Sequence, residues 1–122
     1  MPISPIQPGS AMYPTGGDHP KQQAKHAVEQ VVTATQDLWQ GYNTSNTQMI
    51  TQTHQALAPI MGNLTTTMNH NLGMFSLLEQ SQISSLVTIY ESMTSNPDPL
   101  SPSYHNALES FTLQAKVLNE DL

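Results

Sequence analysis

The 122-residue chain is long enough for one modest domain, and without cysteine it has neither disulfides nor thiolate chemistry. Charged residues make up only 10 %, against about 25 % in ordinary soluble domains, and three lysines without arginine at a formal net charge of −6 argue against nucleic-acid binding. No apolar run approaches the roughly 18 residues that span a bilayer, so stable membrane insertion is not expected.

Residues 1–17 are predicted to form an extended or disordered arm. Four prolines and the Gly16-Gly17 pair disfavour the backbone hydrogen bonds of both α-helices and β-sheets. The first residues of the chain have neither the basic residues nor the apolar stretch of a Sec signal peptide, so no such signal is expected. The arm also carries apolar side chains with which it could lie along a neighbouring subunit: Ile3, Ile6, Met12 and Tyr13.

The first helix is expected over residues 19–57. Asp18 is a good N-cap residue, and Pro20 fits the first turn of a helix. Residues 41–47 are rich in Gly, Asn, Thr and Ser, and are the stretch where this helix would kink or break. Apolar residues recur in steps of three and four, the period of an amphipathic helix, at Ala24, Val28, Val31, Leu38, Tyr42 and Met49.

Two further helices are expected over residues 60–94 and 102–119. Pro59 marks the boundary before the second helix, because proline disfavours helix at the residue before it. Ser101 followed by Pro102 is a good start signal for the third. No segment alternates with the period of a strand. The sequence therefore predicts an all-α fold of two long amphipathic helices and a shorter C-terminal helix, preceded by the proline-rich arm.

The surface expected for residues 18–122 is unusual because amides and hydroxyls take the place of charges. Ser, Thr, Asn and Gln are about as numerous as all hydrophobic residues together. Such groups hydrogen-bond across an interface without burying charge, which suits lateral packing of helices. The composition therefore favours a helical assembly domain that packs on copies of itself, although a polar-rich protein without an assembly role would share it.

No pattern of catalytic or metal-binding residues is found in the sequence. Neither a nucleophile motif nor a glycine-rich phosphate loop occurs, and thin helices offer little room for a pocket. The protein is therefore not expected to be an enzyme or to hold a cofactor or a metal. No HExxH motif and no tight zinc-chelating pair is formed by the five histidines, which are His19, His26, His54, His70 and His105.

Several titratable groups predict a response to acid. Protonating all five histidines changes the formal net charge from −6 to −1, which removes most of the self-repulsion. His26 and Glu29, like His105 and Glu109, can pair on one helical face. Glu79 falls on the apolar stripe of the second helix, where burial would raise its pKa. The candidate switch residues are Glu79, His26, His54, His70 and His105.

Residues 43–93 carry a resemblance to a known family. Their segment Ala56-Leu57-Ala58-Pro59-Ile60-Met61-Gly62-Asn63-Leu64 is similar to the Ala-Pro…Met-Gly-Asn-Leu segment of the Reb-type "killing trait" family, the structural proteins of R-bodies. Glu79-Gln80-Ser81-Gln82 resembles the glutamine-rich run of that family. Ile89-Tyr90-Glu91-Ser92 resembles the Ile-Tyr-Ser close of its motif.

The resemblance implies a subunit of an R-body, a protein ribbon rolled up as an inclusion in the bacterial cytoplasm. Some such ribbons unroll on acidification in a host's digestive compartment and rupture membranes mechanically. The implied partners are further copies of the chain and related paralogous subunits. The side chains expected to carry assembly, each of which also suits the protomer's own core, are Trp39, Tyr42, Met61, Leu64, Phe75, Tyr90, Phe111 and Leu118.

Two other classes of helical protein fit the sequence. Trp39-Gln40-Gly41 spells the Trp-x-Gly of small secreted helical hairpins of the WXG type. In those proteins an acidic residue follows a C-terminal tyrosine at a fixed spacing, whereas Tyr90 is followed at that spacing by Thr94. A needle, rod or phage structural subunit would also be helical and polymeric.

Overall fold

Four α-helices and one short 3₁₀-helix make up most of residues 19–122, the part of the chain that this computed structural model describes. No strand occurs within that range, which confirms the all-α prediction. The predicted arm, residues 1–17, lies outside it. The elements are α1 (His19–Asn43), α2 (Thr47–Asn69), η1 (Leu72–Met74), α3 (Leu77–Thr94) and α4 (Pro102–Asp121).

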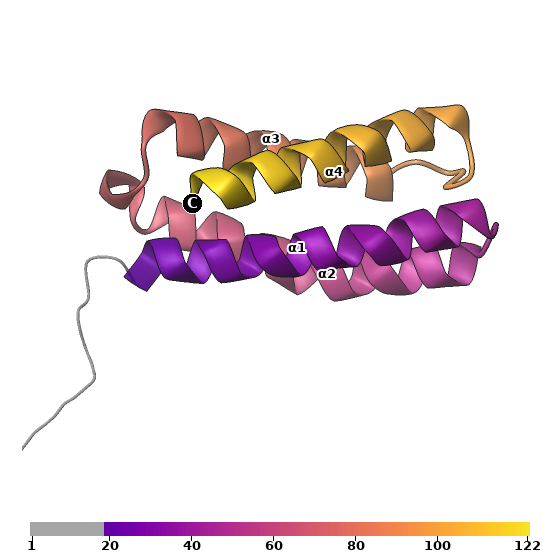
Figure 1. Cartoon of the computed structure of the whole chain (residues 1–122), viewed down its shortest axis with the longest axis horizontal. Coiled ribbons are helices and arrows are strands. Elements are labelled where there is room, and N and C mark those ends of the chain that lie inside the picture. The colour runs from indigo at the N-terminus through magenta and orange to yellow at the C-terminus, as the bar shows by residue number, and fades with distance from the viewer. Residues whose placement is uncertain (1–18) are drawn as a thin grey trace, which may run out of the picture.

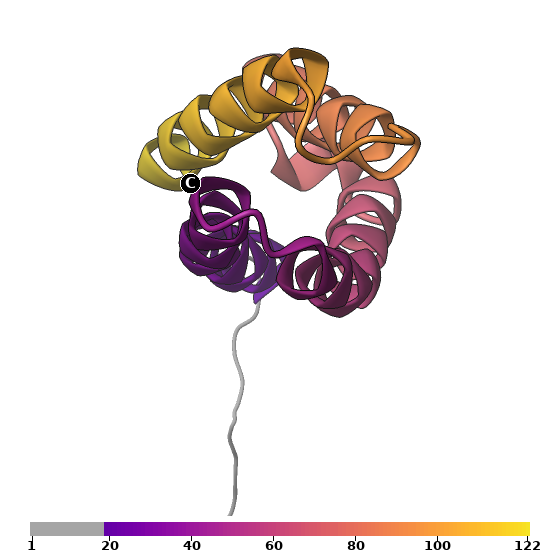
Figure 2. The same cartoon turned by 90° about the vertical axis from the view of Figure 1, so that its right-hand side faces the viewer.

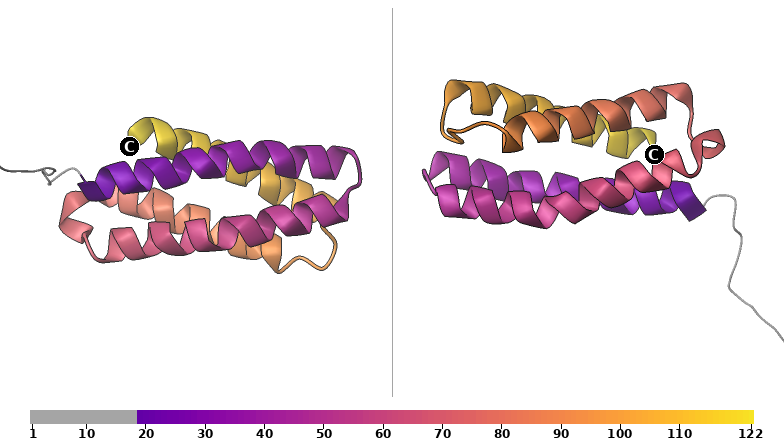
Figure 3. Two further views of the ribbon diagram at one scale, coloured as in Figure 1. Left: turned by 90° about the horizontal axis from the view of Figure 1, so that it is seen from below. Right: turned by 180° about the vertical axis from the view of Figure 1, so that it is seen from behind.

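The four helices run alternately up and down and form an antiparallel bundle (Figure 1). Seen from the end, they occupy four corners in chain order, so each helix packs beside two others (Figure 2). α1 and α2 pack most closely, whereas α2 and α3 approach each other least closely. The α1–α2 and α3–α4 connections lie at one end, while the start of α1 and the α2–α3 connection lie at the other (Figure 3).

The helices form because apolar side chains recur every three or four residues and meet inside the bundle. The spacing in α4 predicts a partner helix, and α4 packs against α1 and α3 of the same chain. The bundle thereby covers its apolar stripes without a second protomer. The side chains that α4 buries are Tyr104, Leu108, Phe111, Ala115 and Leu118.

The predicted first helix is divided at residues 44–46. Asn46 caps α2 by accepting a hydrogen bond from the Met49 N–H at 3.1 Å. A Cβ on Gly41 would lie only 2.8 Å from Ile50 Cγ1, so glycine is required where α1 and α2 approach each other. The stretch rich in Gly, Asn, Thr and Ser is therefore a true boundary between two helices.

Pro59 does not end a helix, contrary to the boundary predicted there. It lies on the exposed side of α2, where water can bind the backbone carbonyl that proline leaves without a donor. The opposite side of α2 buries Leu57, Met61 and Leu64 in the core. This packing supports the helix through the proline, since tertiary contacts contribute most of the stability of a helix in a protein.

The predicted helix over residues 60–94 is interrupted after Asn69. The chain turns through η1, and Ser76 then starts α3 with a capping box. Ser76 Oγ accepts from the Glu79 N–H at 3.0 Å, and Glu79 Oε1 accepts from the Ser76 N–H at 2.8 Å. This Ser-x-x-Glu pattern is visible in the sequence, and it marks a helix start that the apolar spacing alone conceals.

Candidate functional site

Charge is concentrated on one side of the bundle. α2 contains no Asp, Glu, Lys or Arg, and α3 has only Glu79, which is buried, and Glu91, which is exposed. Within residues 19–122, Glu91 is therefore the single charged residue among the exposed residues of α2 and α3. Apart from Glu91, these two helices present an uncharged surface on the side away from α1 and α4, and we call this surface the uncharged face (Figure 2). The neighbouring helices α1 and α4 carry Lys21, Lys25, Glu29, Asp37, Glu109, Lys116, Glu120 and Asp121.

The uncharged face presents hydroxyl, amide and small side chains. A groove of about 410 Å³ lies between its two helices, lined in part by Ala58, Gly62 and Val87, with Glu91 as the one charged residue of its lining. Hydroxyls and amides both donate and accept hydrogen bonds, so such a face is complementary to a second copy of itself. Its exposed residues include Thr51, Gln55, Thr66, Ser84, Thr88 and Ser92.

Most of the residues expected to carry assembly lie in the protomer's own core. They line the apolar stripes that the four helices turn towards one another, so a neighbouring copy cannot reach them in this fold. Only Trp39 and Tyr42 remain partly exposed. This corrects the interface prediction for the other six, which are Met61, Leu64, Phe75, Tyr90, Phe111 and Leu118.

Trp39 and Tyr42 belong to an aromatic cluster between α1 and α4. The Trp39 Nε1–H donates to Thr112 Oγ1 at 2.9 Å. The ring of His105 packs against both aromatic rings, with centroid distances of 5.3 Å to Trp39 and 5.4 Å to Tyr42. These contacts hold the cluster within one chain, and the switch candidate His105 serves there as a packing partner of α1.

His54 is the histidine most involved in the packing of the bundle. Its Nε2 lies 2.8 Å from Tyr104 OH, and its backbone carbonyl accepts a hydrogen bond from Tyr90 OH at 2.6 Å. Burial lowers the pKa of His54 and raises the pKa of both tyrosines, because apolar surroundings disfavour the charged forms. A neutral network therefore joins α2, α3 and α4, and acid would charge the imidazole inside it.

Glu79 is buried on the apolar side of α3, but its pKa shifts in the direction opposite to the one expected. Burial raises this pKa, yet the Ser76 N–H and the Lys21 ammonium together outweigh burial and hold the pKa below its ordinary value. The Lys21 Nζ lies 3.0 Å from Glu79 Oε2. The expectation of a raised pKa is therefore wrong, and Glu79 acts as an ionised helix cap and ion-pair partner.

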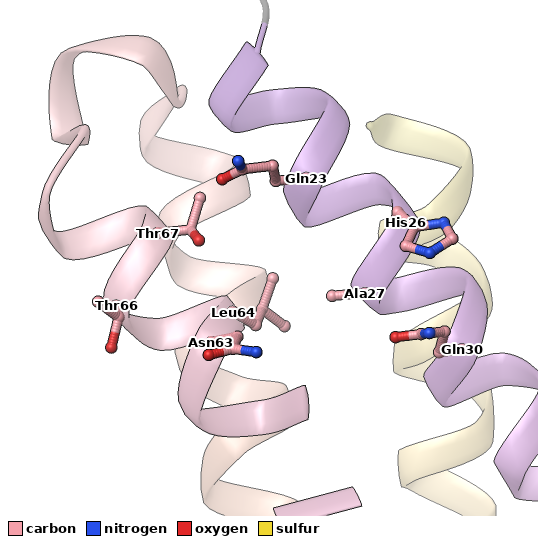
Figure 4. A pocket seen from close by; sticks show the side chains of 8 residues that line it. All are labelled: Gln23, His26, Ala27, Gln30, Asn63, Leu64, Thr66 and Thr67. Atoms are coloured by element: carbon pink, nitrogen blue, oxygen red, sulfur yellow. The ribbon is translucent and has the colours of Figure 1, made fainter. Parts of the chain in front are cut away.

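The other two switch candidates, His26 and His70, are exposed. His26 Nδ1 lies 4.0 Å from Glu29 Oε1, but both side chains are largely in solvent, so the pair contributes little. His70 follows the last turn of α2. His26 also lines a hollow of about 370 Å³ between α1 and α2, whose other polar side chains are amides and hydroxyls (Figure 4). The hollow thus offers neutral hydrogen-bonding groups.

Residues 19–122 contain neither a metal-binding cluster nor a helix suited to crossing a membrane. No three His, Asp or Glu side chains in this range gather into a group that could hold a metal ion. None of the four helices combines the length and the hydropathy that crossing a bilayer requires.

In comparisons with known proteins, no family model, no curated protein and no solved structure matches the chain. The resemblance of residues 43–93 to R-body subunits therefore remains a prediction from the sequence. Two contacts were not anticipated from the sequence, the Lys21–Glu79 ion pair and the His54–Tyr104 hydrogen bond. Helical spacing shows which residues share one face of a helix, but it does not show which residues meet across the bundle.

Proposed function

We propose that the protein is a structural subunit, without catalytic activity, that assembles with copies of itself through the uncharged face of α2 and α3. The observation that carries the proposal is the separation of charge. Each copy has a formal net charge of −6, and most charged side chains lie on α1 and α4. Two copies therefore meet with the least repulsion when they bring α2 and α3 together.

Gly62 adds support for a close contact at this face. A Cβ on Gly62 would meet nothing within 4 Å, so the fold of the single chain does not require glycine at this exposed position of α2. Glycine inside a helix costs about 0.5–1 kcal/mol relative to alanine. The close approach of a helix from a neighbouring copy would account for it.

The form of the assembly that we propose is a ribbon like that of an R-body. The resembling segment, residues 43–93, spans α2, η1 and nearly all of α3, and so includes both helices of the uncharged face. In this proposal paralogous subunits join the ribbon, and acid changes its curvature by charging histidines. The ribbon is stored as a cytoplasmic inclusion of a bacterium and ruptures membranes mechanically after its release.

A second candidate function is that of a secreted helical hairpin of the WXG type. The observation that favours it is the position of Trp39-Gln40-Gly41 in the last turns of α1, just before the connection to α2. Gly41 there allows α1 to approach Ile50 of α2 closely. This candidate predicts a particle of one or two chains rather than a polymer.

Electron microscopy and sedimentation of the full chain at pH 7 and pH 5 test the proposed assembly. We expect ribbons or other extended polymers, with a curvature that differs between the two pH values. Monodisperse monomers or dimers under both conditions would contradict assembly and favour the hairpin. Polymers that are identical at both pH values would support the structural role and contradict the acid response.

Charge insertion tests the uncharged face itself. Gln55→Glu with Thr88→Glu places two carboxylates on the face at exposed positions. Gln36→Glu with Thr33→Glu on α1 is the matched control, because Thr33 and Thr88 both donate their hydroxyl to the carbonyl four residues earlier. We expect the face variant to weaken association at least about tenfold and the control to assemble normally. An equal loss in both would implicate net charge alone.

A further inference from the structure

A group of large apolar side chains is exposed where η1 meets the start of α3. Two of them, Leu77 and Leu78, are 83 % and 63 % exposed. The group lies at the end of the bundle where α1 begins (Figures 1 and 3). Exposed apolar side chains gathered in one place mark a contact surface. We call this group the apolar cap, and its members are Leu72, Met74, Leu77 and Leu78.

The backbone that carries the apolar cap is held in place by hydrogen bonds. Gln80 Nε2 donates to Leu72 O at 3.1 Å and to Phe75 O at 3.0 Å. The capping box of Ser76 and Glu79 fixes the first turn of α3. The cap is therefore a preformed surface, and a segment that covers it loses only its own conformational freedom.

α1 begins at His19, at the same end of the bundle as this cap (Figure 3). Residues 1–18 precede His19 in the chain. Lys21, in the first turn of α1, forms its ion pair with Glu79, which lies in the first turn of α3 next to the cap. The first turn of α1 thus contacts the first turn of α3, which carries Leu77 and Leu78 of the cap.

Two large apolar residues stand close to His19 in the sequence. Tyr13 and Met12 stand six and seven residues before His19. Six extended residues span up to roughly 20 Å. Pro14 restricts its neighbours to extended conformations, which suits a short strap.

We propose that Met12 and Tyr13 pack on the apolar cap of their own chain and tie residues 1–18 to this end of the bundle. A thioether and a phenol ring suit a surface of Leu and Met side chains. The chain's own segment is favoured over that of a second copy, because a short tether gives a millimolar effective concentration. The inference does not rest on the proposed assembly.

Oxidation of Met12 by hydrogen peroxide tests whether this residue is covered. The full chain is treated, and the tryptic peptide that ends at Lys21 is followed by mass spectrometry. Leu77→Ser with Leu78→Ser removes half of the cap at exposed positions, where the core is not disturbed. We expect Met12 to be oxidised at least about fivefold faster in this cap variant than in the wild-type chain.

The matched control for the cap variant is Leu113→Ser with Val117→Ser, which removes two exposed apolar side chains from α4. We expect its Met12 to be oxidised at the wild-type rate. Equal rates in the wild-type chain, the cap variant and the control would overturn the proposal.

A designed disulfide distinguishes the chain's own segment from that of a second copy. Since the chain has no cysteine, Ser10→Cys with Gly73→Cys can form only the designed bond, and a Cβ on Gly73 meets nothing within 4 Å. Ser10→Cys with Asn43→Cys, at the far end of α1, is the control. We expect an intrachain disulfide, seen as a monomer on a non-reducing gel, to form at least about fivefold faster than in the control. A rate equal to the control's, or a linked dimer as the main product, would overturn the proposal.

Discussion

Lys21 Nζ lies 3.0 Å from Glu79 Oε2, and this ion pair joins the first turn of α1 to the first turn of α3. These two helices occupy opposite corners of the bundle, so the contact ties together elements that are not direct neighbours (Figure 2). The same carboxylate closes the capping box of α3 by accepting from the Ser76 N–H. One buried charge therefore supports both a helix start and a contact across the bundle.

Replacing Glu79 with Gln is expected to lower the free energy of unfolding at pH 7 by about 1 kcal/mol. Glutamine still accepts from the Ser76 N–H, but it cannot pair with the Lys21 ammonium. The pKa of Glu79 in the folded chain lies below its ordinary value. Its ionised form therefore stabilises the fold above about pH 4.3, and this stabilisation is lost as the pH falls further. Urea denaturation of both chains between pH 7 and 3 measures the effect.

The stability difference between the wild-type and Glu79→Gln chains should be constant above about pH 5 and shrink below it. Lys21→Met is the second variant, and it should destabilise the chain at pH 7 at least as much, because it leaves a buried carboxylate without its cation. A difference that grows on acidification would contradict the lowered pKa of Glu79.

Replacing Gly41 and Gly62 with alanine should have opposite effects on the free energy of unfolding. At Gly41 the added Cβ would lie 2.8 Å from Ile50 Cγ1 and 3.2 Å from Asn46 O, so we expect a loss of about 1–3 kcal/mol in the free energy of unfolding. At Gly62 the Cβ meets nothing, and the better helix propensity of alanine should add about 0.5–1 kcal/mol. Thermal or urea denaturation of the two variants checks both signs.

Assembly assays on the same two variants separate folding from association. Gly62→Ala should stabilise the chain and yet weaken polymer formation, if the glycine serves the close approach of a second copy. Stabilisation by alanine at both positions would show that α1 and α2 do not approach as closely at Gly41 as the structure has them.

The helical class could be predicted because apolar steps of three and four are a local pattern. The start of α4 at Ser101 was predicted correctly for the same reason, since Ser-Pro is a local signal. The number of helices did not follow from the apolar steps, because these steps continue through the breaks before Thr47 and Leu77. Residues 41–47 indicated a kink or a break, but the composition of this stretch did not decide between the two. At these breaks Asn46 and Ser76 each cap the helix that follows. Such a side chain can act as an N-cap only where the chain has already turned and a new helix begins.

The sequence could not show which helix packs against each apolar stripe, and the reason here is different. The apolar spacing from Tyr104 to Leu118 indicates that α4 packs on a helix, but it is the same whether that helix belongs to its own chain or to another. The burial of Glu79 could be inferred from its register. Its ion pair depends on Lys21, which reaches it only through the arrangement of all four helices. The direction of the Glu79 pKa shift was therefore missed.

Thr112→Val should report on the contact between α1 and α4 through Trp39, the chain's single tryptophan. Valine keeps the shape of threonine but removes the acceptor that lies 2.9 Å from Trp39 Nε1. We expect the free energy of unfolding to fall by about 1 kcal/mol and the tryptophan emission to shift. Thr112→Ser, which retains the hydroxyl, is the control and should preserve the emission spectrum. Identical spectra for all three chains would argue against this hydrogen bond.

Acid should weaken the fold through His54. Because burial lowers the pKa of His54, the folded chain favours the neutral imidazole, whereas the unfolded chain binds a proton at about pH 6.5. The free energy of unfolding should therefore fall as the pH drops below about 6.5. His54→Gln removes the titrating group while an amide can still bond Tyr104 OH. His26→Gln, at an exposed position, is the matched control.

Urea denaturation at pH 7 and pH 5 should show a smaller loss of stability in the His54→Gln chain than in the wild-type and His26→Gln chains. An equal loss in all three chains would assign the acid sensitivity to other groups. This result also concerns the proposed ribbon, because of where His54 lies in the bundle. Its hydrogen bonds join α2 to α3 and α4, so its protonation would loosen the two helices that form the uncharged face. A change of curvature would then begin inside each protomer rather than at the histidines on its surface.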